Sequence, residues 1–135
     1  MPAPSTAPCS LRIALILVGV ALLIWLTFEN HSELLVLIFA AICSVLFTLK
    51  LILWVGLDRF SVYAWVIGGG LSGLAVPLLA ALFMFLKNGL HSHIAPDFTL
   101  AQVVSVLQRA PFFVMGGSLL GLGIGLLCDF RKDSP

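Results

Sequence analysis

The sequence predicts an all-α, polytopic membrane protein, and two observations support that prediction. First, four long apolar runs are separated by short polar segments. Second, 61% of the 135 residues are hydrophobic and 10% are charged, whereas an ordinary soluble domain is about a quarter charged. A hydrocarbon core roughly 30 Å thick needs about 20 helical residues to span it. We therefore expect four transmembrane helices, over about residues 11–28, 34–57, 62–86 and 112–128.

The two ends of the chain fall outside this transmembrane domain, which we expect over residues 11–128. Residues 1–10 are rich in Pro, Ala, Ser and Thr and are predicted to be a disordered tail, and residues 129–135 form a short C-terminal tail. The first apolar run has some features of a signal peptide. However, no A-x-A-like cleavage site follows it, so we expect a retained helix.

The positions of the basic residues predict the orientation. With four crossings both termini lie on one side. That side carries the larger share of positive charge, from Arg12, Arg59, Arg131 and Lys132, with Lys50 within reach. The opposite side carries only Lys87 and Arg109. By the positive-inside rule we expect both termini in the cytoplasm, with the protein in a bacterial inner membrane or an internal membrane.

Lys50 is the only charged residue inside an apolar run. It lies roughly 10 Å from the end of its predicted helix, at 1.5 Å per residue. A lysine stem can extend over that distance to the membrane surface. The alternative is a buried cation that pairs with an anionic lipid, a substrate or a partner subunit. Lys50 is therefore a predicted lipid or partner contact.

Glycine spacing predicts where the last two crossings pack. Gly117, Gly121 and Gly125 recur every four residues, and Gly69 and Gly73 have the same spacing in the third run. In lipid, helices associate where small residues allow their backbones to approach closely. We therefore expect a glycine zipper, formed either between the third and fourth crossings of one chain or between subunits.

The third run also contains Pro77, whose ring is expected to clash with the carbonyl of Gly73 and to kink the helix. Ser72 is a candidate to bond a backbone group that the kink frees. Discontinuous helices also line substrate paths in transporters. The segment from Gly68 to Pro77 is therefore the most suitable place for such a path.

A short amphipathic helix is predicted over about residues 98–109, between the third and fourth crossings. Thr99 and Gln102 have the spacing of a capping box, and Asp97 just ahead favours a helix N-terminus. The helix is too short to span a bilayer and too apolar to lie free in water. We expect it to lie in the membrane interface. The alternative is a docking helix for a partner protein.

Histidine and acidic residues gather on one side of the predicted membrane domain. They are Glu29, His31 and Glu33 in one turn, and His91, His93 and Asp97 in the long loop. His-x-His with a carboxylate suits Zn²⁺ or Cu²⁺, so His91, His93, Asp97 and His31 are candidate metal ligands. The same residues could relay protons or ligate a pigment or haem. The alternative is a solvated polar cap that binds nothing.

The motifs that are missing narrow the function. The chain has no C-x-x-C, H-E-x-x-H, G-x-S-x-G or P-loop motif and no basic cluster for nucleic acid. We expect no enzyme and no required cofactor. The sequence favours a small accessory, assembly or stabilising subunit that contacts the lipid bilayer and other membrane-protein subunits or further copies of itself. The alternative is a small oligomeric transporter or channel with its path near the glycine-rich third helix.

Overall fold

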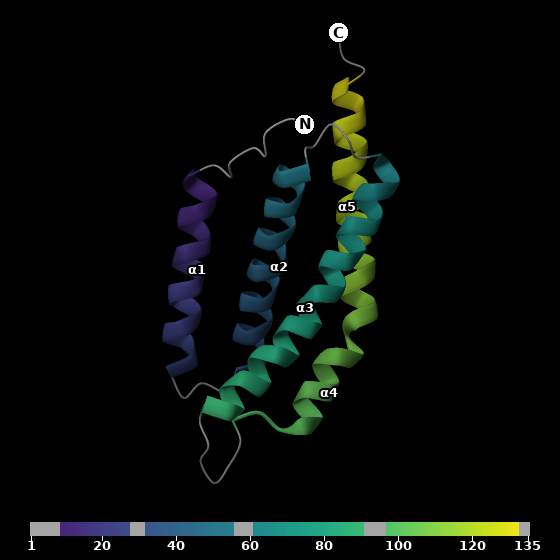
Figure 1. Ribbon diagram of the computed structural model, residues 1–135. Helices are drawn as coiled ribbons and strands as arrows, with labels where there is room; N and C mark the ends of the chain where they lie inside the picture. Colours follow the sequence, from purple (N-terminus) through teal and green to yellow (C-terminus); the bar gives the residue numbers. More distant parts are fainter. Residues whose placement is uncertain (1–8, 28–31, 56–60, 91–96, 133–135) are drawn as a thin grey trace.

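The computed structural model describes residues 9–27, 32–55, 61–90 and 97–132 of the chain (Figure 1). Every regular element among these residues is an α-helix. The helices are α1 (Cys9–Thr27), α2 (Glu33–Val55), α3 (Val62–Leu90), α4 (Leu100–Gln108) and α5 (Ala110–Lys132). The predicted all-α class is therefore confirmed for the described part of the chain.

Three apolar helical segments are long enough to cross a membrane: Glu33–Ile52, Val62–Leu90 and Leu100–Phe130. In α1 the corresponding apolar segment, Ile13–Trp25, is shorter. The third long segment runs through both α4 and α5, because these helices follow each other at Arg109 without an intervening loop. Length and composition therefore support a membrane protein with three spans, and the fourth span and a separate interfacial helix stay predictions.

Helix α3 is the centre of the arrangement (Figure 1). It packs against α2, α4 and α5, and its contact with α5 is the most extensive between any two described helices. Helices α3 and α5 run antiparallel, and α1 lies at the edge of the structure beside α2 (Figure 1). The end of α1, the start of α2, the end of α3 and the start of α4 all lie at the same end of the bundle.

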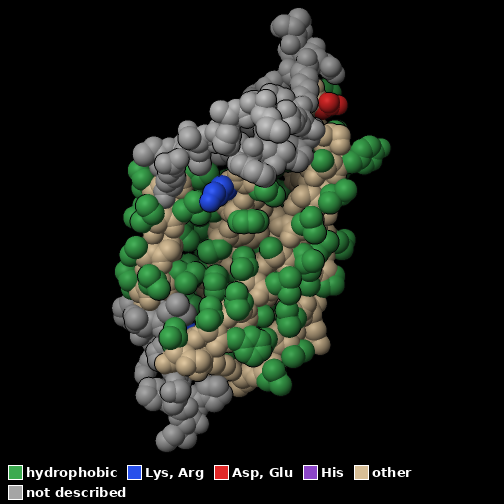
Figure 2. Space-filling view, in the orientation of Figure 1, with side chains coloured by type: hydrophobic (Ala, Val, Ile, Leu, Met, Phe, Trp, Pro, Cys, Tyr) green, Lys and Arg blue, Asp and Glu red, His purple; other side chains and the backbone are tan. Residues whose placement is uncertain are grey.

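The described part of the face shown in Figure 2 is largely apolar. Large hydrophobic side chains are exposed on every described helix, among them Leu17 on α1, Phe47 on α2, Leu71 on α3, Leu100 on α4 and Leu120 on α5. A monomeric soluble protein rarely exposes a continuous apolar surface of this extent. The surface is therefore consistent with a location in a membrane, where these side chains contact lipid.

Glycines bring the backbones of α3 and α5 into contact. A Cβ atom at Gly69 would overlap the carbonyl oxygen of Gly117 and lie 3.1 Å from the Cα of Gly121. A Cβ at Gly117 would in turn overlap the carbonyl oxygen of Gly69, and one at Gly73 would overlap that of Phe113. No other residue fits at these positions without a shift of the backbone.

The contact continues towards the C-terminal half of α5. A Cβ at Gly121 would overlap the carbonyl oxygen of Trp65, and one at Gly125 would lie 3.1 Å from the Cβ of Trp65. The structure thus places the five glycines that the spacing selected, Gly69, Gly73, Gly117, Gly121 and Gly125, at the α3–α5 contact within one chain.

Several helix boundaries differ by a few residues from those expected, and two of these differences change the position of a residue discussed below. The third apolar run was expected to end at residue 86, but α3 continues to Leu90 and so includes Lys87. Helix α5 begins at Ala110, so that Pro111 falls in its first turn, where a missing N–H is tolerated. Pro77 is buried inside α3, which is one continuous helix across it, and the kink at Pro77 stays a prediction.

Two glycines of α5 provide a matched test of the close contact. We expect Gly121→Ala to destabilise the folded protein by about 1–3 kcal/mol, because the new methyl group must displace the backbone of α3. A Cβ at Gly123 would meet nothing within 4 Å. Gly123→Ala should therefore be neutral or stabilising by up to about 1 kcal/mol, since alanine is the better helix former. Thermal unfolding in detergent measures both, and equal unfolding temperatures for the two variants would contradict the contact.

Candidate functional site

A buried lysine lies where α1, α3 and α4 meet. Lys87 is in the last turn of α3 and its side chain is fully buried. Its Nζ lies 4.6 Å from the centre of the Trp25 ring, 5.7 Å from the centre of the Phe98 ring and 4.0 Å from Oδ2 of Asp97. A buried charge is costly unless it is paired, and here two aromatic rings and a carboxylate surround the ammonium group.

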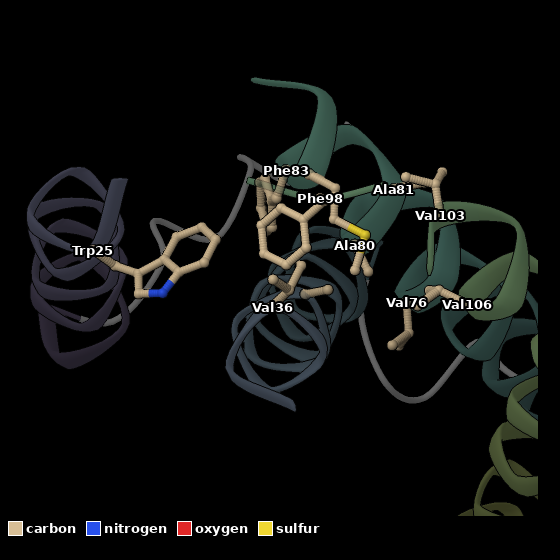
Figure 3. Close-up of a cluster of buried hydrophobic side chains, with 11 residues drawn as sticks. Trp25, Val36, Val76, Ala80, Ala81, Phe83, Phe98, Val103 and Val106 are labelled. Carbon is tan, nitrogen blue, oxygen red and sulfur yellow. The ribbon is translucent and has the colours of Figure 1, made fainter. Parts of the chain in front are cut away.

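The Trp25 ring comes from the end of α1 and points across the bundle towards Phe98 and Val36 (Figure 3). It is buried, and its ring centre lies 5.6 Å from that of Phe39 on α2. An indole ring is the best aromatic partner for a cation. Trp25 therefore joins α1 both to the charge on α3 and to the aromatic surface of α2.

Asn88 fixes the chain that returns from α3 to α4. Its Nδ2 donates to the carbonyl oxygen of Phe98 at 2.8 Å, and the N–H of Phe98 donates to its Oδ1 at 2.9 Å. Directly afterwards the predicted capping box is confirmed, with Thr99 and Gln102 exchanging hydrogen bonds between side chain and backbone. We call Lys87, Asn88, Asp97 and Phe98 the α3–α4 corner.

Apolar packing surrounds this corner (Figure 3). Val103 and Val106 on the inner face of α4 are buried in one hydrophobic cluster with Ala80 and Met84 of α3 and Val36 of α2. An ion pair at 3.7 Å joins Arg109, after α4, to Glu33 at the start of α2. Apolar contacts therefore hold α4 against α3, and the ion pair joins its end to α2.

The candidate metal ligands are mostly outside the described residues. His31, His91 and His93 lie outside them, and only Asp97 is described, beside Lys87. Within residues 9–27, 32–55, 61–90 and 97–132, no three His, Cys, Asp or Glu side chains gather in a group suited to a metal. Metal or pigment ligation stays a prediction, and any metal that used Asp97 would have to compete with the Lys87 ammonium.

Lys50 is exposed on α2, among side chains that are largely apolar. The structure therefore places this lysine on the outside of the bundle, where a lipid or a partner can reach it. Its role as a lipid or partner contact stays a prediction. The lysine that the structure buries is Lys87, which lies one residue beyond the predicted end of the third crossing.

A groove with a volume of about 960 Å³ lies between α2, α3 and α5, and Leu11 of α1 also contributes to its lining. Both α3 and α5 contribute glycines and larger apolar side chains to its lining. Its lining includes Val45 and Thr48 from α2, Gly68 and Ser72 from α3, and Gly116 and Leu120 from α5. We call this the α2–α3–α5 groove.

Three hydroxyl groups bond to one another beside the groove. Ser44 Oγ donates to the carbonyl oxygen of Ser72 at 2.7 Å and lies 3.0 Å from its Oγ. Thr48 Oγ1 lies 2.9 Å from the carbonyl oxygen of Ser44 and 3.1 Å from Ser72 Oγ. The Ser72 hydroxyl, expected to bond a freed group of its own helix, instead bonds hydroxyl groups of α2. These bonds join α2 to α3 within the apolar part of the bundle.

Two glycines that line the groove have no close neighbour within the chain. A Cβ at Gly68 or at Gly116 would meet nothing within 4 Å. Gly69, next to Gly68, and Gly117, next to Gly116, are by contrast in backbone contact with the opposite helix. The packing of α3 on α5 therefore explains Gly69 and Gly117 but leaves Gly68 and Gly116 without an internal role.

The fold and these two regions define an all-helical protein with three helices able to cross a membrane, a buried cation at one end and an open apolar groove along its side. Comparisons with protein-family models, with curated proteins and with solved structures found no match to this chain. The proposals below are therefore based on the geometry of the described residues.

The link between Ser44 and Ser72 can be measured with a double-mutant cycle. The bond from Ser44 Oγ to the Ser72 carbonyl persists in Ser72→Ala, so the cycle reports the contact between the two hydroxyl groups. We expect that contact to couple Ser44→Ala and Ser72→Ala by about 0.6 kcal/mol, the average for hydrogen bonds between helices in a membrane protein. Ser105 bonds the backbone of its own helix at Gln102, so the pair Ser44→Ala and Ser105→Ala serves as the uncoupled control. Unfolding in mixed detergents gives the free energies. Additive effects of the Ser44 and Ser72 substitutions would show that the contact between the two hydroxyl groups contributes nothing.

Proposed function

We propose that this protein is a non-enzymatic accessory, assembly or stabilising subunit of a larger membrane complex, and that it receives a transmembrane helix of a partner in the α2–α3–α5 groove. The observation that carries this proposal is the pair of unpacked glycines, Gly68 and Gly116, that line the groove from two different helices.

Glycine is costly in a helix unless close packing requires it. Relative to alanine it weakens a helix by about 1 kcal/mol. In a membrane that cost is offset where a neighbouring backbone approaches closely, as happens at Gly69 and Gly117. No described residue of this chain approaches Gly68 or Gly116 in that way. A helix from another protein would make use of both positions.

The chemistry of the groove fits a helix better than a hydrated solute. Its lining is almost entirely apolar, and Thr48 and Ser72, which contribute hydroxyl groups to it, are already engaged in hydrogen bonds between α2 and α3. Gly69 and Gly73, which also line the groove, are in backbone contact with α5. A transporter or channel with its path near Gly68–Pro77 remains the second candidate, since the groove runs along the same segment.

The proposal includes a topology of four crossings. At 1.5 Å per residue, the 19 residues of α1 extend about 28 Å, close to the thickness of the hydrocarbon core. With α1 as a crossing, both termini lie on the side richer in Lys and Arg, which is the cytoplasm. Helix α4 then lies near the opposite membrane surface, and the α3–α5 contact acts as a glycine zipper within the chain.

Purification in a mild detergent tests the proposed function. We expect the tagged protein to be recovered with at least one other membrane protein at a fixed ratio, identified by mass spectrometry. Gly68→Leu and Gly116→Leu fill the groove without overlapping any atom of this chain at the Cβ position. We expect both variants to fold, and we expect the amount of partner recovered with them to fall at least tenfold.

Gly123→Leu is the matched control, because Gly123 is also unpacked but does not line the groove. It should retain the partner. Recovery of the wild-type protein alone would contradict the accessory function. Recovery of homo-oligomers that transport a solute in liposomes would instead favour the second candidate. Equal partner recovery with Gly116→Leu and Gly123→Leu would show that the partner binds elsewhere.

A further inference from the structure

Helix α1 lacks the close packing that holds the other helices together. Only Leu11 and Trp25 are buried among the α1 side chains whose exposure is described, residues 11 and 13–25. Leu17 and Leu23 are 63% and 65% exposed, and a Cβ at Gly19 would meet nothing within 4 Å. Because lipid replaces water around these side chains, their exposure provides no force that drives α1 onto the bundle.

The contact at the end of α1 has a different chemistry. Trp25 covers the Lys87 ammonium at 4.6 Å and packs against the Phe39 ring. Its Nε1 is buried, and among the described residues it has no hydrogen-bond partner. The Trp25 side chain is therefore held by the cation and by ring contacts rather than by a hydrogen bond.

The cation itself is fixed without α1. Asp97 Oδ2 and the centre of the Phe98 ring lie 4.0 Å and 5.7 Å from the Lys87 Nζ, and the two hydrogen bonds between Asn88 and Phe98 hold that segment on α3. The ammonium is part of the α3–α4 corner whether or not Trp25 covers it. One partner of this contact is thus anchored to the core, and the other lies at the end of a weakly packed helix.

We propose that the Trp25–Lys87 contact is a latch that holds α1 on the bundle, and that loss of the charge at Lys87 releases α1 while α2–α5 stay folded. The strength of a cation–π contact shielded from water corresponds to a shift of about thirtyfold in the ratio of docked to released α1. The proposal goes beyond the groove and does not depend on what occupies it. It makes α1 a movable element whose position depends on one charge.

Fluorescence of a single tryptophan tests the latch. In a Trp54→Phe/Trp65→Phe background, Trp25 is the only tryptophan. The protein is reconstituted in vesicles whose lipids carry bromine on their acyl chains, and the quenching of Trp25 by these lipids reports its exposure. We expect weak quenching in the background protein and at least twofold stronger quenching with Lys87→Met and Lys87→Gln. Lys87→Arg retains a cation and should restore the weak quenching.

Lys50→Met is the matched control, because it removes the exposed lysine of α2 and leaves the α3–α4 corner intact. It should leave the quenching of Trp25 unchanged. Circular dichroism and gel filtration report whether the helices of the bundle persist. Unchanged quenching in a folded Lys87→Met protein would overturn the proposal. Collapse of the whole helical bundle in both neutral variants would overturn it too, since a latch for α1 leaves α2–α5 folded.

Discussion

The backbone contact between α3 and α5 is the constraint on which the rest of the structure depends. In lipid no water is released when apolar helices meet, so the helices associate where their backbones can approach each other. Gly69 and Gly73 on α3, with Gly117 and Gly121 on α5, allow that approach. Each glycine weakens its own helix, and the contact between the helices offsets that cost. Besides α5, helices α2 and α4 pack against α3.

The other contacts of α3 use different chemistry at different depths. In the apolar middle, the hydroxyl groups of Ser44 and Ser72 bond α2 to α3. At the end of α3, Lys87 and Asn88 hold the segment that starts α4. Helix α1 makes neither kind of close contact along most of its length, and its end packs through Trp25. The contacts between helices are therefore most extensive at α5 and least extensive at α1.

Local patterns in the sequence predicted local features well. The apolar runs located the helices, and the Thr99–Gln102 spacing identified the capping box. The spacing of glycines selected five residues that the structure brings together. Contacts between distant residues were not predictable in this way. Lys87 stands at the end of an apolar run, and nothing near it in the sequence indicates that Trp25, more than sixty residues earlier, covers it.

The groove shows a second limit of sequence patterns. Gly68 and Gly69 are adjacent and identical in type, as are Gly116 and Gly117. All four line the groove, but only Gly69 and Gly117 are in backbone contact with the opposite helix. The rotation of each helix about its axis decides which glycine makes that contact, and the spacing of glycines in the sequence does not fix the rotation. The candidate metal residues His31, His91 and His93 lie outside the described residues, so their prediction is unchanged.

The two hydrogen bonds between Asn88 and Phe98 have a consequence for how the chain can vary. They join two residues that are ten positions apart. The position at which α4 begins is therefore fixed by α3 and does not depend on the intervening residues. The entropic cost of closing a loop rises only slowly with its length. Insertions between residues 90 and 97, including an epitope or a small tag, therefore lengthen this segment without changing the orientation of α4 relative to α3.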